Sequence, residues 1–435
     1  MNPFKSLMRS LHLYLSLVSG LVVAVVCFTG GVLVFEKELE QAWHPERYFV
    51  TPAATPPQSL AQLAAAVQAY KPGAKVVGVK VHADPTRTVE FSLAGDEKKG
   101  EGKSGEDKGR GSDAGGNARR AEGSNPAAGS KSEQSKPLSP QDPKSLTQAP
   151  KSPKGEGGGG PKVFVNPYTA AVTGELIYRE TFFFTMMALH RGMVGGPVGK
   201  LVVGVCTLLF LFILITGLVL WWPATRKALR QRLSVKWSGG WKRLNHDFHI
   251  VLGFYSALFL LVFAFTGLAW SFEWFNKGIY AVTNSPMQRP EPPTSAEPAP
   301  GAPAQLTPDA ALAWARQQAP QAQFVSLQLP KDSTGSLRVA TLRPNAAHDN
   351  ATDEVYLDQY TGRVLSQQTY EQRNLGQRVR GMFKPVHTAA VFGWPSKIIG
   401  LVTCLLGFTF PITGTILWLN RLRKQRKKQQ KLAVV

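Results

Sequence analysis

The amino-acid sequence predicts a membrane protein with an α-helical four-helix bundle and two exported α+β domains, built by internal duplication. The first observation is a set of four apolar runs of 22–25 residues that contain no Asp, Glu, Lys or Arg: 11–35, 201–222, 250–272 and 398–419. About 20 helical residues cross the roughly 30 Å hydrocarbon layer of a bilayer, so each run is long enough to span it. The second observation is that patterns of the first half recur in the second. The four runs are too long for buried core helices, which excludes a soluble protein.

The distribution of charge sets the expected orientation. The 435-residue chain carries 50 Lys and Arg against 29 Asp and Glu, a net charge of +21. Such a balance is typical of nucleic-acid-binding proteins, but here the basic residues cluster beside the apolar runs. Lys5 and Arg9 precede the first run, and the segments 223–243 and 420–435 are rich in Lys and Arg and contain no acid. The positive-inside rule then places both termini and the middle loop in the cytoplasm, so we expect a lipid bilayer and no nucleic acid as partner.

The runs and the composition between them divide the chain into membrane helices and connecting parts. The expected order is a membrane helix at 1–36, an external domain at 37–197, a membrane helix at 198–222, a cytoplasmic basic loop at 223–248, a membrane helix at 249–274, a second external domain at 275–395, a membrane helix at 396–419 and a cytoplasmic basic tail at 420–435. The first run is too long for a signal peptide, so we expect an uncleaved anchor.

Two segments have compositions that do not support a packed core. Residues 95–161 are rich in Gly, Ser, Lys, Glu and Pro, which predicts a disordered insert in the first external domain. Residues 285–305 are rich in Pro and Ala, which predicts a linker.

The duplication is read from ungapped matches between the two halves. The matched positions are His12 with His249, Thr29-Gly30 with Thr266-Gly267, His190 with His387, and Thr216-Gly217 with Thr413-Gly414. Parallel repeats of this kind are commonly related by a pseudo-twofold axis along the membrane normal.

The external domains repeat as well. Residues 163–169 match 355–361, and each segment predicts a strand followed by a tight turn. Helical patterns occur at 60–70 and 308–318, and alternating stretches follow them. Each external domain is therefore expected to be a helix over a small antiparallel sheet.

Five of the eight histidines lie at the ends of the apolar runs, and the topology sorts four of them into pairs. His12 and His249 begin the first and third helices on the cytoplasmic side, whereas His190 and His387 precede the second and fourth helices on the external side. A twofold axis would bring the members of each pair face to face. Two facing imidazoles in a four-helix bundle suit the two axial positions of a b-type haem. One such site in each leaflet would form a path for electrons across the membrane.

Two other interpretations of the paired histidines remain open at this point. They could anchor helix ends at the membrane interface, or they could hold Zn or Cu, which imidazole also suits. The cysteines are distant in sequence, and no acid lies within three residues of His12, His190 or His387. This favours haem over a bare metal ion.

His246 competes with His249 for the same role. Arg243-x-x-His246 resembles Arg9-x-x-His12, whereas the Thr-Gly register favours His249. Positions i and i+3 share one helix face, so only one of the two is expected to be an axial ligand.

Three arginines lie close to these histidines in the sequence. Arg9, Arg243 and Arg191 are candidates for binding haem propionates, because arginine pairs with carboxylates in a bidentate manner. Snorkelling to lipid headgroups is the alternative. His44, His82 and His348 lie in the external domains and are expected to be solvated.

The residues above match the pattern of a known family. The matching segments are Leu11-His12 to Thr29-Gly30, Leu189-His190-Arg191-Gly192 to Trp221, 245–253, His387 to Trp418, and the Tyr-Thr turns at 168 and 360. On these segments the chain resembles the PepSY-associated transmembrane family, which comprises iron-regulated bacterial inner-membrane proteins with four helices and two periplasmic PepSY-type domains. The insert at 95–161 departs from the family pattern.

The resemblance implies a location and an activity. It implies a multi-pass protein of the bacterial inner (cytoplasmic) membrane, with both termini cytoplasmic and two large periplasmic domains. Members of the family include di-haem reductases of ferric siderophores. By this resemblance two haem b groups would be held by His12, His249, His190 and His387.

The leading hypothesis is therefore a ferric-chelate oxidoreductase. A cytoplasmic flavin, flavoprotein or quinol would supply electrons, and a ferric siderophore or other ferric chelate would receive them outside. The alternatives are a membrane-anchored PepSY interaction or sensor protein that regulates a peptidase, and a metal transporter. The transporter ranks last because four helices offer little room for a transport path and the runs contain no acid.

Overall fold

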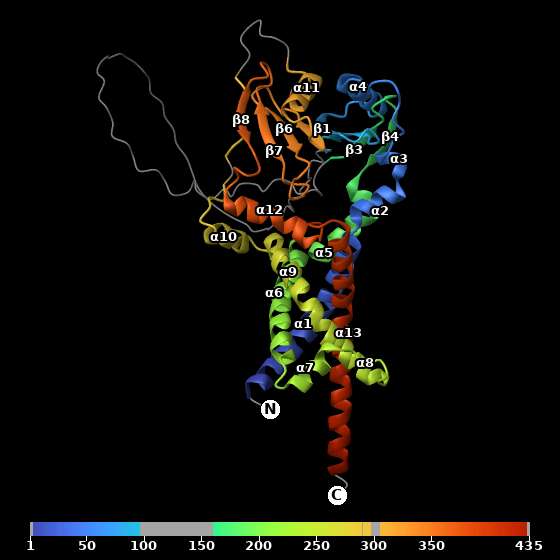
Figure 1. The fold of residues 1–435 in the computed structure, drawn as a ribbon, viewed down its shortest axis with the longest axis vertical. Helices are drawn as coiled ribbons and strands as arrows, with labels where there is room; N and C mark the ends of the chain where they lie inside the picture. Colours follow the sequence, from blue (N-terminus) through green and yellow to red (C-terminus); the bar gives the residue numbers. More distant parts are fainter. Residues whose placement is uncertain (1–2, 96–159, 289, 297–304, 433–435) are drawn as a thin grey trace, which may run out of the picture. The chain divides into compact units, whose positions relative to one another are not determined.

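The computed structural model describes residues 3–95, 160–288, 290–296 and 305–432 (Figure 1). The insert predicted at 95–161 therefore lies outside the described residues except at its ends, as does part of the linker predicted at 285–305. Within the described residues, four helices are long and apolar enough to cross a membrane: α1 (Pro3–Leu33), α6 (Gly196–Trp221), the continuous helix Trp241–Ser271 and α13 (Trp394–Leu432).

Three of these helices extend well beyond the apolar runs, and α1 does so by beginning at Pro3. The third begins at Trp241, and α13 continues to Leu432 through the residues predicted as a basic tail. Lys, Arg and Gln are good helix formers, so the end of an apolar run is no signal to end the helix.

The third membrane helix changes its winding near its start. It consists of α8 (Trp241–Asp247), one π-helical turn, η3 (Phe248–Leu252), and α9 (Gly253–Ser271). A π turn occurs mostly as a single turn inside an α-helix, frequently at a functional site. This turn contains His249.

The four long helices pack in a cyclic order. α1 contacts α6 and α13, and α9 contacts the same two helices (Figure 1). α1 and α9 therefore lie opposite each other across the group, as do α6 and α13.

Short helices connect the membrane helices to the rest of the chain. They are α2 (Glu36–Trp43), α3 (Pro45–Tyr48), η2 (Tyr178–Glu180), α5 (Phe182–Gly192), α7 (Arg226–Leu233), α10 (Glu273–Val282) and α12 (Leu375–His387). α5 turns tightly into α6, and a side chain at Gly199 would lie only 1.8 Å from the carbonyl oxygen of Gly192. This close approach requires glycine at that position.

The strands form one antiparallel sheet instead of the two small sheets expected from the sequence. Their bounds are β1 (Val76–His82), β2 (Val89–Leu93), β3 (Lys162–Val165), β4 (Val172–Leu176), β5 (Phe324–Gln328), β6 (Leu337–Leu342), β7 (Asp353–Leu357) and β8 (Val364–Gln368). The order is β4-β3-β2-β1-β5-β6-β7-β8. The junction between the halves is the pairing of β1 with β5, from Gly78 opposite Gln328 to His82 opposite Phe324. Joining these two edges satisfies backbone groups that would otherwise be exposed.

The sheet buries one face beneath helices α4 (Leu60–Tyr70) and α11 (Pro308–Gln318) (Figure 1). Leu63 and Val67 of α4 and Ala311 and Ala315 of α11 are almost fully buried in this core. The first turn of α4 is capped from the other half of the chain, because Asp309 accepts hydrogen bonds from the backbone N–H groups of Leu60 (2.6 Å) and Ala61 (3.1 Å). A carboxylate at a helix N-terminus stabilises both the free N–H groups and the helix dipole.

Glu90 of β2 is a buried carboxylate with several cationic neighbours. Burial raises its pKa, but the hydrogen bond with His82 (3.0 Å) and the charges of Lys80 and Lys162 outweigh burial and lower the pKa to about 2. Glu90 is therefore ionised in the fold.

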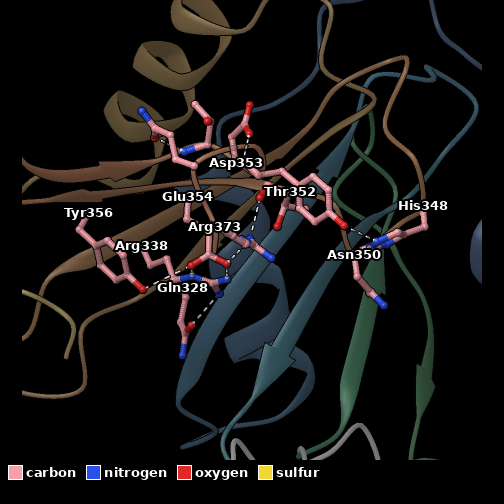
Figure 2. Close-up of polar contacts among 12 residues, drawn as sticks. Gln328, Arg338, His348, Asn350, Thr352, Asp353, Glu354, Tyr356 and Arg373 are labelled. Atoms are coloured by element: carbon pink, nitrogen blue, oxygen red, sulfur yellow. Dashed lines mark hydrogen bonds and ion pairs between the residues drawn. The ribbon is translucent and has the colours of Figure 1, made fainter. Parts of the chain in front are cut away.

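A second polar cluster lies in the other half of the sheet (Figure 2). Glu354 accepts hydrogen bonds from Arg338 (3.2 Å) and Arg373 (2.9 Å), and His348 contacts the hydroxyl of Tyr370 (3.1 Å). The prediction that His82 and His348 are solvated is therefore wrong, because each imidazole has a polar partner at a partly buried position.

Candidate functional site

Two pairs of histidines meet among the membrane helices. His12 of α1 and His249 of the π turn form the first pair, with ring centres 6.5 Å apart. His190 near the end of α5 and His387 at the end of α12 form the second pair, with ring centres 5.9 Å apart. The pairing is the one predicted from the sequence register.

Each histidine is fixed through Nδ1 by a threonine on a neighbouring membrane helix. The contacts are His12 with Thr216 (3.1 Å), His249 with Thr413 (2.9 Å), His190 with Thr29 (3.3 Å) and His387 with Thr266 (3.0 Å). Each threonine hydroxyl donates its own hydrogen to a carbonyl one turn back in its helix, so it accepts from the imidazole N–H.

Backbone carbonyls provide a second acceptor for three of the four rings. Nδ1 lies 3.0 Å from the carbonyl oxygen of Ile213 for His12, of Val26 for His190 and of Phe263 for His387. Such contacts require the proton on Nδ1 and leave the lone pair on Nε2, the nitrogen then free to bind a metal.

The glycine that follows each threonine makes room for the ring. A methyl group at Gly217 would lie 3.2 Å from Cε1 of His12, and one at Gly30 would lie 3.0 Å from Cε1 of His190. A methyl group at Gly414 would lie 3.2 Å from Cε1 of His249, and one at Gly267 would lie 3.2 Å from Cε1 of His387. Each of the four Thr-Gly pairs therefore provides the space and the hydrogen-bond acceptor for one imidazole ring.

The separation within each pair suits two ligands on opposite sides of one metal ion. A metal–imidazole bond is about 2.0 Å and a ring nitrogen lies about 1.2 Å from its ring centre, so such rings have centres about 6.4 Å apart. The observed values of 6.5 and 5.9 Å lie close to this. No cluster of three or more His, Cys, Asp or Glu able to hold a metal occurs in the described part of the chain. Two imidazoles without further protein ligands fit a metal that brings its remaining ligands with it, as haem iron does.

The comparison with known families assigns the chain. The family model of the PepSY-associated TM region matches residues 9–421. The chain belongs to the PepSY-associated transmembrane family. A comparison with curated proteins gives no match.

In this PepSY-associated protein, a buried polar group lies one helical turn from the Thr216-Gly217 site that contacts His12. The indole N–H of Trp221 on α6 is buried and has no hydrogen-bond partner among the described residues. Trp221 lies one turn beyond Gly217 and stacks on Phe254 with ring centres 3.6 Å apart. A buried unpaired donor is costly, so a ligand with an acceptor atom would stabilise it.

The structure separates His246 from the first pair. Its Nδ1 lies 3.1 Å from Asp247, and its side chain is 47% exposed. Asp247 also pairs with Arg243 (2.9 Å). His249, and not His246, faces His12.

The remaining predicted arginines differ in their surroundings. Arg9 is partly buried on α1, whereas Arg191 is exposed on α5. Arg243 is held by Asp247, so its charge is already compensated.

Sequence reasoning missed the role of the threonines. The Thr-Gly pairs served only as markers of the repeat register, although each pair stands at the same spacing from a histidine in both halves. The equal spacing in both halves could have indicated that the histidine–threonine contacts are repeated along with the helices.

Proposed function

We propose that this protein carries electrons across the bacterial inner membrane and reduces a ferric chelate on the external side. His12 with His249, and His190 with His387, would each hold one haem b, which would supply reversible one-electron chemistry. The observation that supports this most strongly is that the two separate pairs have similar ring separations, 6.5 and 5.9 Å, and that every ring contacts a threonine through Nδ1 and packs on the glycine that follows it.

The spacing of the pairs supports a path across the membrane. His12 and Thr29, which belong to different pairs, lie 17 residues apart on α1. At 1.5 Å per residue this is about 25 Å, close to the thickness of the hydrocarbon layer. The basic segments 223–243 and 420–435 favour a cytoplasmic position for the first pair and an external position for the second.

An internal duplication accounts for the repeated geometry. In this proposal α1, α5 and α6 correspond to α9, α12 and α13, related by a pseudo-twofold axis along the membrane normal. Each half also contributes four strands to the sheet, in the same antiparallel order.

The chain's own groups have three tasks in this function. Threonines and backbone carbonyls hold the Nδ1 protons, so Nε2 of each ring stays available as a ligand. The apolar helices exclude water from the pairs. The external domain leads the chelate to the second pair, and reduction releases the iron because Fe(II) is bound more weakly than Fe(III) by hard oxygen ligands.

The electron donor on the cytoplasmic side would be a reduced flavin, a flavoprotein or quinol. A PepSY interaction or sensor protein and a metal transporter are the competing functions. The sensor function predicts a captured protein partner and purified protein without haem.

Vesicles containing the purified protein test the proposal. A reductant is enclosed in the vesicles, ferric citrate is added outside, and an external chelator specific for Fe(II) reports reduction. We expect ferrous iron to form with the wild type and with His246→Ala, and not with His12→Ala or His190→Ala. Equal rates in all four proteins would contradict the proposal.

A further inference from the structure

Arg380 of α12 is a partly buried cation beside the second histidine pair. Its guanidinium lies over the ring of Trp270, 4.9 Å from the ring centre, and its Nε donates to Oδ1 of Asn276 at 2.7 Å. Asn276 in turn donates to the carbonyl oxygens of Ala269 and Phe272 at the end of α9. The guanidinium is thus held in one orientation by a fixed neighbour.

The charge of Arg380 has no acidic counterpart within the described residues. No ion pair joins it to a carboxylate, and its one hydrogen bond goes to a neutral amide. Burial lowers the pKa of Arg380 from its usual value, and only Tyr280 acts in the opposite direction. A desolvated guanidinium with free N–H groups attracts an anion.

The surrounding helix adds positive charge. α12 contains Arg378, Arg380 and Lys384 and no acid. α5, which carries the matched His190, has no basic residue before that histidine. On the proposed topology α12 is external, where the positive-inside rule gives no reason for such a cluster.

Trp270 connects this cation to the second pair. The indole ring centre lies 5.2 Å from that of His387, and the guanidinium lies over the same indole. The indole therefore neighbours both the guanidinium and the His387 ring, so an anion bound at Arg380 would lie near the second pair.

We propose that Arg380, oriented by Asn276 and Trp270, forms a carboxylate-binding site for an anionic metal chelate next to the second histidine pair. Its planar fork matches a carboxylate in a bidentate manner. The assignment of this chelate as electron acceptor rests on the proposed function, and it restricts the substrate class to chelates that present a free carboxylate.

Gallium citrate provides a test that is independent of electron transfer. Gallium(III) replaces ferric iron in such chelates but does not accept an electron under these conditions. Its binding to the purified full-length protein is measured by calorimetry for the wild type, Arg380→Gln and Arg378→Gln. Arg378 is an exposed residue of the same helix, so its substitution removes the same charge without touching the Trp270 site.

The expected result is an affinity lower by about 10-fold or more in Arg380→Gln and nearly unchanged in Arg378→Gln, because a charge-assisted pair is lost only in the first. Arg380→Lys, which keeps the charge and loses the fork, should fall between them. Unchanged affinity in Arg380→Gln, or equal loss in both glutamine variants, overturns the proposal. Haem-free wild-type protein with Arg380-dependent binding would overturn the electron-transfer function and leave this site standing.

Discussion

Replacement of Thr413 by valine tests whether the threonines orient the histidine ligands. Nδ1 of His249 has Thr413 as its single acceptor among the described residues, at 2.9 Å. Nδ1 of His12 has both Thr216 and the carbonyl oxygen of Ile213, at 3.1 and 3.0 Å. Valine has nearly the shape of threonine and lacks the hydroxyl, so the substitution removes the acceptor for Nδ1 together with the hydrogen bond that the hydroxyl donates within its own helix. The same substitution should therefore have unequal effects at the two histidines that we propose hold one haem.

The size of the difference follows from the hydrogen bonds that remain. Thr413→Val leaves a buried N–H without a partner, which costs about 1–3 kcal/mol, or roughly a 5- to 150-fold loss of affinity. Thr216→Val leaves the carbonyl contact of His12 in place, so its cost should stay below about 1 kcal/mol, or roughly fivefold.

The assay is titration of haem into haem-depleted protein, followed by the Soret absorbance. The dissociation constant at the first pair should rise clearly for Thr413→Val and slightly for Thr216→Val, while the second pair keeps its wild-type affinity in both variants. Equal effects of the two substitutions, or no effect of Thr413→Val, would refute the assignment of the threonines as orienting groups.

Three further predictions test the packing and the electrostatics. Gly217→Ala places a methyl group 3.2 Å from Cε1 of His12 and should lower the free energy of unfolding, measured by thermal unfolding, by about 1–3 kcal/mol, with loss of one haem. Gly253→Ala is the control, because its nearest neighbour lies at 3.9 Å, and it should be neutral or slightly stabilising. The pKa of Glu90 is lowered to about 2, so its ionised carboxylate should stabilise the fold by about 3 kcal/mol at pH values above its ordinary pKa. This stabilisation should disappear as the pH falls through about 2. Glu90→Gln should flatten that part of the pH profile of denaturant unfolding, and an unchanged profile would argue against the ion pair. Asp309→Ala removes the two hydrogen bonds that this carboxylate accepts from the first turn of α4, while the capping box of Ser59 and Gln62 remains. The free energy of unfolding of the sheet domain, measured by hydrogen exchange, should fall by about 1 kcal/mol, and unchanged protection of α4 would contradict this.

The membrane helices and the pairing of the histidines could be predicted from the sequence, because both depend on local patterns. Apolar runs fix the spans, and the equal spacing from His12 to Thr29 and from His249 to Thr266 fixes the register. The π turn at His249 was not predictable, because a single turn of wider winding leaves no mark on hydrophobic periodicity.

The pairing of distant strands and the contacts between distant side chains could not be predicted from sequence patterns either. The pairing of β1 with β5 joins strands that lie far apart in the chain, and nothing in either strand distinguishes an exposed edge from a paired one. The solvation assumed for His348 failed because its partner Tyr370 lies on a different segment. The site at Arg380 could not be predicted, because its neighbours Trp270 and Asn276 come from other helices.

The central claim is that each histidine pair holds one haem, and an absorption measurement on alanine variants tests it most directly. Reduced-minus-oxidised spectra of protein from haem-replete cells should show two bis-imidazole haems in the wild type and in His246→Ala. His12→Ala and His249→Ala should each lose the same haem and keep the other, and His190→Ala and His387→Ala should lose the second. Wild-type protein without a bis-imidazole spectrum, or loss of different haems from His12→Ala and His249→Ala, would contradict the account.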